Sequence, residues 1–209
     1  MDTTFFENIN SKLELKLNHF VPILLLRENK KIVTYLKEIN KSKNREDYDF
    51  ELNLSQGEAA EEYVKNYLII NGGYKFISYN RNSKNKKDFD LLMSIEKDGE
   101  VKQVTFEVKL DFKAGFKKNG GTGNLAIEEE CRGVDSGIRT TKADYYVYLN
   151  PIENEIGFIK VDVLKKLMSD LKSQGIGRMH TDGGDLNSNT INYLMPYEYF
   201  QSKFKVRQL

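Results

Sequence analysis

Apolar residues in the middle of the chain first repeat as in a helix and then alternate as in strands. Between Ala59 and Leu68 they recur at the spacing of one helical face, which predicts an α-helix. Ser55 and Glu58 have the spacing of a capping box at the start of that helix. A glycine pair ending at Gly73 permits positive φ and is expected to end it.

Strand-like alternation follows in three segments, residues 74–79, 89–95 and 102–110. The pair Asp98-Gly99 separates the last two and suits the primed turn of a β-hairpin. Further on, the pattern predicts a glycine- and lysine-rich loop at residues 115–123 and two strands at residues 143–149 and 157–161. It then predicts a helix at residues 162–172, a second glycine-rich loop at 182–185 and a short C-terminal helix at 197–204. This order predicts an α/β fold with a mixed central sheet rather than an alternating, doubly wound one.

Residues 1–52 differ from the rest and are expected to form an N-terminal extension, partly extended and partly helical. Strand-like alternation at residues 13–17 is followed by an apolar run at 20–26 and by helical spacing at 27–43. The polar stretch 40–49 would link this extension to a main domain of residues 53–209. The extension could serve as an arm, a lid or a dimerisation element.

The composition limits the metal sites and the classes of protein that are compatible with the chain. A formal net charge of +1, from 32 basic and 31 acidic residues, excludes a globally basic protein of the histone kind. The single Cys131 excludes an internal disulfide and a cysteine-built zinc site, and two distant histidines exclude a histidine-rich one. Any metal is therefore expected to bind oxygen ligands, as Mg²⁺, Mn²⁺ and Ca²⁺ do.

No segment has the pattern of a membrane span or a signal peptide. The longest apolar run, residues 20–26, is too short to cross a bilayer. It also lacks a basic leader and a small-residue cleavage site. Together with the single cysteine, these features predict a soluble protein of a reducing, cytoplasmic compartment.

The residues with the clearest chemical potential lie on the predicted hairpin. Glu107 and Lys109 are two apart on a strand and therefore leave the same face, opposite Phe106. A carboxylate there can hold a divalent cation, while the ammonium positions or activates a water or stabilises charge on a phosphate. Hairpin pairing can bring Asp90 close as a second carboxylate, and Glu58 is a candidate third acid.

Each of these residues has a simpler explanation when it is taken alone. A Glu-x-Lys pair on an amphipathic strand is commonly a solvated pair, Asp90 could be a turn residue, and Glu58 could be the capping-box acid. Their order along the chain is more informative than any one of them. It consists of an acid on a first helix, an aspartate, a hairpin and a Glu-x-Lys strand.

In this order the chain resembles the PD-(D/E)XK nuclease superfamily over residues 55–149. The resemblance implies a restriction-endonuclease-like mixed central sheet flanked by helices, with Glu58, Asp90, Glu107 and Lys109 as catalytic residues and the three acids as metal ligands. No proline precedes the motif aspartate. Asp88 and Asp90 share a strand face, so either could be the ligand; Asp90 is preferred because it directly precedes an apolar Leu-Leu pair.

Later segments resemble a phage-associated branch of that superfamily. After the Glu-x-Lys strand, the chain has a Thr-Gly-Asn segment ending in Ile-Glu, then Ser-Gly-Ile, then a Thr-rich segment with Ala-Asp-Tyr, and finally Gly-Asp-Leu-Asn. These segments are residues 121–128, 136–138, 140–148 and 184–187. The resemblance implies a phage-encoded protein that works in the host cytoplasm.

Further residues are candidates for support of the centre or for contact with a substrate. Asn124 and Glu128 would share a face if residues 124–128 are extended, so Glu128 could be an accessory acid; equally, residues 128–130 could be a solvated acidic run. Thr141 and Lys142 could contact a phosphate or simply cap an element. Lysines flank the acids on both sides, either to neutralise phosphates or to aid solubility, and Phe112 and Phe116 could stack on bases. The lysines are Lys84, Lys86, Lys87, Lys113, Lys117 and Lys118.

Taken together, the residues and the resemblance predict an enzyme that hydrolyses phosphodiester bonds in DNA with Mg²⁺ or Mn²⁺, an endonuclease. Asp90 and Glu107 would hold the metal, Lys109 would activate or orient the attacking water, and Glu58 would assist. The alternatives are a Holliday-junction resolvase, an exonuclease, an RNA-cleaving variant, a catalytically inactive nucleic-acid-binding module, and a protein-interaction factor. Duplex cleavage by two such centres would need a homodimer.

Overall fold

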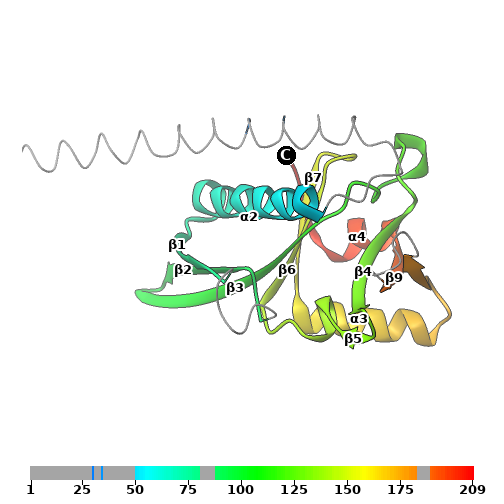
Figure 1. Ribbon diagram of the computed structural model, residues 1–209. Helices are drawn as coiled ribbons and strands as arrows, with labels where there is room; N and C mark the ends of the chain where they lie inside the picture. Colours follow the sequence, from blue (N-terminus) through cyan, green and yellow to red (C-terminus); the bar gives the residue numbers. More distant parts are fainter. Residues whose placement is uncertain (1–29, 31–33, 35–49, 81–87, 183–188) are drawn as a thin grey trace, which may run out of the picture.

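The computed structural model describes residues 30, 34, 50–80, 88–182 and 189–209, and these form an α/β fold (Figure 1). Its larger sheet is mixed, because the third and fourth strands along it are parallel and all other neighbours are antiparallel. The strands of this sheet, in spatial order, are β1 (Lys75–Tyr79), β2 (Leu91–Lys97), β3 (Glu100–Leu110), β6 (Tyr145–Asn150), β7 (Glu155–Lys160) and β10 (Lys205–Gln208).

A second sheet was not predicted from the sequence. It is antiparallel, and its strands in spatial order are β5 (Val134–Asp135), β4 (Asn124–Cys131), β9 (Thr190–Pro196) and β8 (Arg178–Asp182). The described residues also form the helices α2 (Phe50–Gly72), α3 (Val161–Ser173) and α4 (Tyr197–Lys203), with short 3₁₀ turns at Lys117–Asn119 and Gly137–Arg139.

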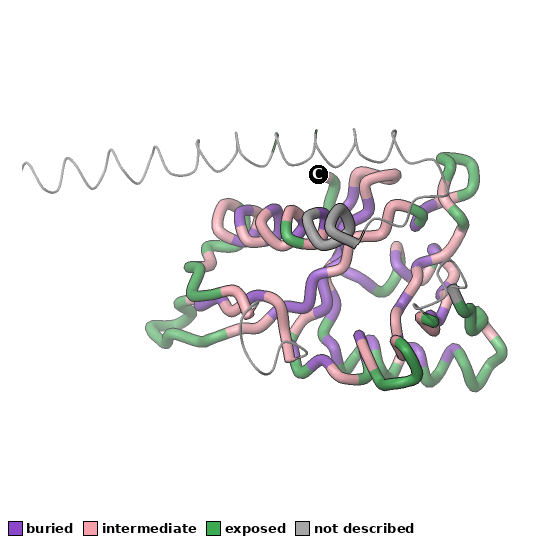
Figure 2. Tube along the Cα trace, in the orientation of Figure 1, coloured by how far each residue is buried: buried purple, intermediate pink, exposed green. Residues whose placement is uncertain are grey.

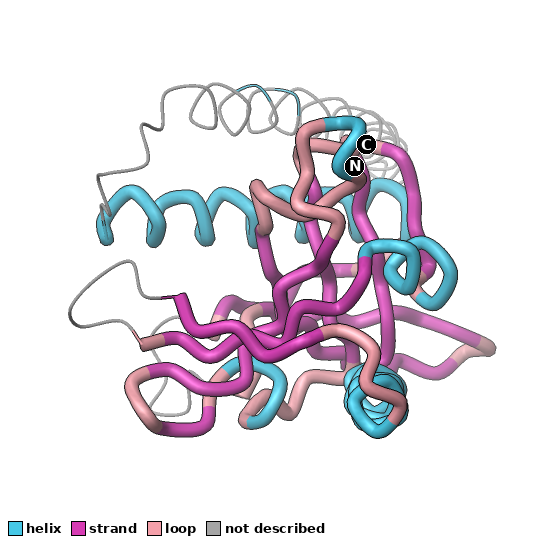
Figure 3. Tube along the Cα trace, turned by 90° about the vertical axis from the view of Figure 1, so that its right-hand side faces the viewer, coloured by secondary structure: helices cyan, strands magenta, loops and turns pink. Residues whose placement is uncertain are grey.

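The six-stranded sheet has a separate hydrophobic core on each face. Helix α2 covers one face, where Val64 and Leu68 pack with Leu91, Phe106 and Val147. The second sheet, α3 and α4 cover the other face. Figure 2 shows buried segments along both sides of the central strands, and Figure 3 shows α2 and α3 on opposite sides of the sheet. Residues that alternate along β6 therefore enter different cores, as Tyr146 and Val147 do.

The predicted hairpin is confirmed, including its turn. Strands β2 and β3 pair in an unbroken antiparallel register from Leu91 opposite Phe106 to Lys97 opposite Glu100. Asp98 and Gly99 both have positive φ, 54° and 77°, as a primed turn requires.

The predicted start of the first helix is wrong. Ser55 lies within α2, whose helical backbone already begins at Phe50, so Ser55 cannot be an N-cap, because a cap residue has non-helical backbone. The helix thus begins inside the expected extension of residues 1–52. Its predicted end is confirmed, since Gly73 has a φ of 68°.

Several predictions fall outside the described residues. These are most of the N-terminal extension, the basic loop with Lys84, Lys86 and Lys87, and the segment 183–188 that includes the late glycine-rich motif. Among the helices that the structure describes, none is long and apolar enough to cross a membrane.

Candidate active site

Strand pairing places Asp90 across from Glu107. The N–H of Asp90 donates to the carbonyl of Phe106 (2.9 Å), which continues the β2–β3 ladder by one residue. Beyond that point a side chain replaces the backbone as the acceptor: the Oδ2 of Asp90 accepts a hydrogen bond from the N–H of Val108 (2.7 Å). The carboxylate is thereby fixed against β3 beside the Glu-x-Lys pair.

Glu107 is held from both of its carboxylate oxygens. Its Oε1 lies 2.7 Å from the Nζ of Lys109, and its Oε2 accepts a hydrogen bond from the Thr141 hydroxyl (3.1 Å). The side chain of Glu107 is only 8% exposed, against 33% for Lys109. The expected solvated surface pair is therefore wrong for Glu107, because the second sheet and the Thr141 segment cover this face of β3.

The electrostatics of the site show two acids competing for one cation. Burial raises the pKa of Asp90 to about 7, and the charge of Glu107 adds to the rise. Burial alone would lower the pKa of Lys109, but Glu107 outweighs this effect and the pKa lies well above its usual value. Lys109 is thus firmly protonated, while a further cation near Asp90 would relieve the repulsion between the two carboxylates.

Tyr146 is a component of the site that sequence reasoning missed. It pairs with Glu107 across β3 and β6 and leaves the same face. The side chain is completely buried, and its hydroxyl has no hydrogen-bond partner within the described part of the chain. Burial raises the pKa of this hydroxyl, and the charge of Glu107 adds to the rise. An unsatisfied buried hydroxyl is costly and indicates a position for a water or a ligand oxygen.

Glu128 reaches the site from the second sheet. Its charge contributes to the raised pKa of both Tyr146 and Tyr148, so its half-buried carboxylate lies on the same side of the larger sheet. Gly137 allows the 3₁₀ turn to pack closely against β4 at this residue: a Cβ there would lie 2.5 Å from the Glu128 carbonyl oxygen, and its φ is 50°. Residues 124–128 are extended in β4, as the accessory-acid prediction requires.

The alternative of a solvated acidic run at residues 128–130 is wrong for its middle member. Glu129 is buried, with a side chain only 5% exposed, and it pairs with Arg139 at 3.0 Å and with Lys172. Glu130 also pairs with Arg139. Because both oxygens of Glu129 are used by these cations, this residue holds the 3₁₀ turn and α3 against β4.

The structure distinguishes the two aspartates that the sequence left open. Asp88 points its carboxylate to Lys142, with an Nζ–Oδ1 distance of 3.1 Å. Its carbonyl oxygen accepts hydrogen bonds from the Thr141 hydroxyl (3.2 Å) and from the Lys142 N–H (2.8 Å). Asp90, by contrast, lies at Glu107, so Asp88 supports the Thr141 segment rather than the acidic centre.

On helix α2, Glu58 does not occupy the position expected of a third ligand. Its side chain is exposed, and the α2 carboxylate that raises the pKa of Asp90 is that of Glu61, three residues further along the helix. Residues three apart lie on neighbouring positions of a helix surface, so Glu58 and Glu61 are close on α2. The capping-box spacing was misleading because α2 begins at Phe50, before Ser55.

The residues present fit a magnesium ion held mostly by water. Within the described ranges, no group of three or more acidic, histidine or cysteine side chains is arranged to hold a metal. Two carboxylates, Asp90 and Glu107, do lie together, and Mg²⁺ is typically bound by one or two carboxylates while it keeps several waters. The unsatisfied hydroxyl of Tyr146 would provide a partner for such a water.

The predicted substrate-contacting residues have varied positions. Lys113, Lys117 and Lys118 are exposed on the loop after β3, while Lys142 pairs with Asp88 at the other end of the site. The amide of Asn124 donates to the carbonyl of Thr122 (3.2 Å) in a local turn. Phe116 packs edge-on against Tyr197, with ring centroids 5.0 Å apart, so its ring belongs to the core rather than to a base-stacking surface.

Asp111 is a second residue that the sequence patterns did not single out. Its Oδ1 accepts hydrogen bonds from the N–H groups of Lys113 (2.7 Å) and Ala114 (3.0 Å), at the start of the glycine-rich loop. Through these two hydrogen bonds, Asp111 orders the loop that directly follows the Glu-x-Lys strand. Burial raises the pKa of its carboxyl.

The assembled site is a buried carboxylate pair with a protonated lysine and an unsatisfied tyrosine hydroxyl, and the charge of Glu128 acts on that tyrosine from the second sheet. Comparison with protein-family models, curated proteins and solved structures gave no match, so the function must be argued from these residues themselves.

Proposed function

We propose that the protein is a Mg²⁺- or Mn²⁺-dependent nuclease that hydrolyses phosphodiester bonds in DNA, as the resemblance to the PD-(D/E)XK superfamily implies. The observation that supports this most is the position of Asp90 beside the Glu107–Lys109 ion pair on adjacent strands. Two carboxylates and an ammonium, enclosed on one face of a sheet, match the needs of metal-assisted attack on a phosphate.

The topology is consistent with the restriction-endonuclease-like arrangement that we propose for the central sheet. Helix α2 is followed by the antiparallel strands β1, β2 and β3, and then β6 joins β3 in parallel. The acids of the proposed centre come from the β2–β3 hairpin, as expected from the order of the motif residues.

In the proposed mechanism, Asp90 and Glu107 would hold a divalent ion, and that ion would supply Lewis-acid stabilisation of the phosphate and a water of lowered pKa. Thr141 fixes the Glu107 carboxylate through its hydroxyl. Because Lys109 is firmly protonated, it acts by orienting the attacking water and by stabilising negative charge on the phosphate, not as a general base. Glu128 supports the same water through its position near Tyr146.

A catalytically inactive binding module is the main rival, and the burial of the acids argues against it. Placing two carboxylates in a covered site destabilises the fold unless they serve a cation. A module that only binds phosphates would also gain nothing from acids at its centre, since they repel the backbone. A resolvase, an exonuclease and an RNA-cleaving enzyme could use the same site and are separated by the choice of substrate.

The test is cleavage of supercoiled, linear, branched and single-stranded DNA, and of RNA, with Mg²⁺ or Mn²⁺. Glu107→Gln and Lys109→Ala are expected to abolish cleavage. The matched controls Glu96→Gln and Lys97→Ala, at exposed positions of the same hairpin, should cleave as the wild type does. Cleavage that persists in both site variants would contradict the proposed site, and binding without cleavage by the wild type would favour the inactive module.

A further inference from the structure

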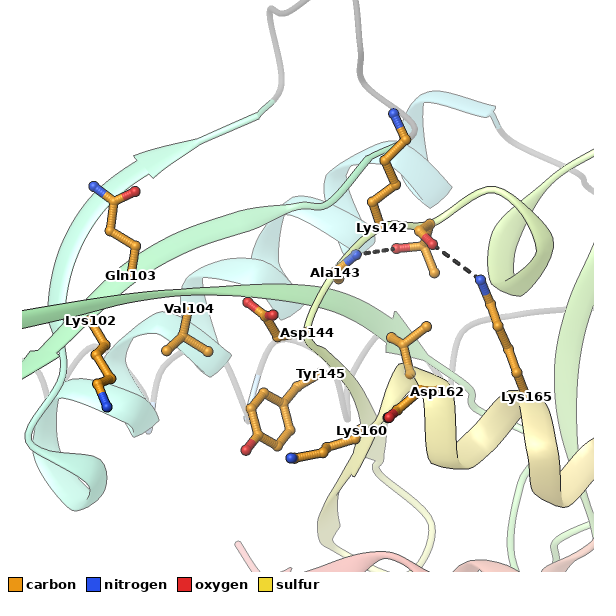
Figure 4. A pocket seen from close by; sticks show the side chains of 12 residues that line it. Lys102, Gln103, Val104, Lys142, Ala143, Asp144, Tyr145, Lys160, Asp162 and Lys165 are labelled. Atoms are coloured by element: carbon orange, nitrogen blue, oxygen red, sulfur yellow. Dashed lines mark hydrogen bonds between the residues drawn. The ribbon is translucent and has the colours of Figure 1, made fainter.

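A pocket of about 630 Å³ lies at one end of the six-stranded sheet. It forms where β3 runs past the first residue of β6, since β3 pairs with β6 only from Phe106 onward. Three elements and one connecting segment contribute a lysine each, and Figure 4 shows their side chains. They are Lys102 on β3, Lys142 before β6, Lys160 at the end of β7 and Lys165 on α3.

The acidic residues of the lining do not neutralise these lysines. The carboxylate of Asp144 accepts hydrogen bonds from the N–H (2.8 Å) and hydroxyl (2.9 Å) of Thr105. Asp162 accepts a hydrogen bond from the N–H of Val163 (2.8 Å). With four lysines against two aspartates, the lining has a formal charge of +2. It is therefore suited to an anion.

Two of the lysines have no acidic partner in the part of the chain that the structure describes. Lys160 forms no ion pair there, and the Nζ of Lys165 reaches only a neutral group, the carbonyl of Thr141 at 3.4 Å. The other two form ion pairs that are partly or largely exposed, Lys102 with Glu100 at 3.5 Å and Lys142 with Asp88. Pairs of this kind contribute little and are readily exchanged for a phosphate.

Thr141 connects the pocket to the candidate active site. It lines the pocket, its carbonyl contacts Lys165, and its hydroxyl contacts the Glu107 carboxylate. Gln103, which also lines the pocket, leaves the same face of β3 as Glu107 and precedes it by four residues, which corresponds to roughly 13 Å, or about four stacked nucleotides of one strand. The loop that contains Lys113 begins beyond the opposite end of β3, so Glu107 lies between two basic regions.

We propose that this pocket binds the phosphodiester backbone of one nucleic-acid strand whose scissile bond lies at Glu107, an inference that rests on the proposed nuclease function. The lysines come from three elements and one connecting segment and surround a volume larger than one phosphate needs, which fits a run of phosphates. Between them, Val104 and the half-buried Tyr145 offer apolar surface to a sugar or a base.

The experiment measures binding by the full chain in the presence of EDTA, so that no strand is cut. Fluorescence anisotropy with labelled single-stranded DNA, duplex DNA and RNA is compared for the wild type, Lys160→Ala/Lys165→Ala and the control Lys166→Ala/Lys203→Ala. The control removes the same charge from exposed positions outside the pocket. Thermal melting checks that each variant folds, and Lys160→Arg/Lys165→Arg tests rescue by a conserved charge.

The pocket variant is expected to bind about tenfold or more weakly near 0.1 M salt, and its salt slope on duplex DNA should fall by about 2, since each lost phosphate contact removes about 0.9. The control should match the wild type. Equal affinity of the pocket and control variants, or no nucleic-acid binding by the wild type, would overturn the proposal. A mononucleotide that binds as tightly as the oligonucleotides would also overturn it, since the pocket would then hold a single nucleotide.

The outcomes separate this inference from the proposed function. Loss of binding in the pocket variant of a protein that cuts no substrate would support the pocket and contradict the nuclease. If the wild type cleaves and its pocket variant binds and cleaves normally, the result would support the nuclease and contradict the pocket. The DNA and RNA arms identify which backbone is bound.

Discussion

On one face of β3, Phe106 and Val108 pack against helix α2; on the other, Glu107 and Lys109 form an ion pair beside Asp90. Both faces are covered, but they are covered for different purposes. The apolar face buries large side chains and stabilises the fold. The polar face encloses charges at a cost in stability, which is reasonable where those charges act on a ligand.

The two faces should therefore respond in opposite ways to substitution. Changes on the polar face are expected to remove activity while the fold persists. Changes on the apolar face are expected to lower the free energy of unfolding without touching the reacting groups.

The largest expected effect is on activity. Lys109→Met should reduce cleavage by about a thousandfold or more, because it removes the only described cation in contact with Glu107 and with it the stabilisation of phosphate charge. The measurement is the cleavage rate at saturating Mg²⁺, with circular dichroism to confirm folding. Lys97→Met is the control, and activity within tenfold of the wild type would refute the assigned role of Lys109.

The next effect is on stability. Phe106→Ala should lower the free energy of unfolding by about 3–5 kcal/mol, because Phe106 is only 1% exposed, stacks on Tyr145 and contacts Tyr74 edge-on. Urea unfolding at pH 7 measures it. A loss below about 1 kcal/mol would show that the α2 core is not closely packed around this ring.

The stability of the polar face, unlike that of the apolar face, is expected to depend on pH. The pKa of Asp90 is about 7 in the folded chain and 3.8 for an ordinary aspartate, so the folded state binds more protons between these values. The metal-free protein should therefore lose stability as the pH rises from about 4 to 7, and then level off. Asp90→Asn should remove this loss, so the variant should be more stable than the wild type at pH 8, by about 2–4 kcal/mol, and equal to it near pH 4.

Urea unfolding in EDTA at pH 4, 6 and 8 provides the comparison, with Asp98→Asn in the exposed hairpin turn as a control. If Asp90→Asn shows the same pH slope as the wild type, the buried carboxylate pair is not the source of the effect.

The smallest effect separates two tyrosines of β6. The hydroxyl of Tyr146 has no partner among the described residues, whereas that of Tyr148 donates to the carbonyl of Ala126. Tyr146→Phe should therefore leave the stability unchanged or slightly higher, and Tyr148→Phe should cost about 1 kcal/mol. Only Tyr146→Phe is expected to slow cleavage, by about tenfold. Equal stability losses in the two variants would show that the Tyr146 hydroxyl has a partner in solution.

Local patterns in the sequence are sufficient to predict the hairpin and the relation of its residues. Alternation in β3 separates Phe106 from Glu107, and Asp98-Gly99 sets the turn, because both depend on neighbouring residues alone. These two features together predict that Asp90 lies near Glu107, as it does.

The rest depends on contacts between distant parts of the chain, which no local pattern contains. Strands β4 and β9 pair residues such as Asn124 and Pro196, and this pairing creates the sheet that encloses Glu107. The buried position of the Tyr146 hydroxyl follows from the same enclosure. The capping-box spacing draws attention to Glu58 rather than Glu61, but Ser55 and Glu58 both lie within α2 and not at its start.

The central claim is that Asp90 and Glu107 together hold a divalent cation next to Lys109. Its most direct test is the shift of the melting temperature with increasing Mn²⁺ or Mg²⁺ at pH 8, for the full chain and for Asp90→Asn and Glu107→Gln. We predict a saturable rise for the wild type and none for either variant, because a ligand that binds the folded state stabilises it. A rise of equal size in the variants, or no rise in the wild type, would contradict the claim.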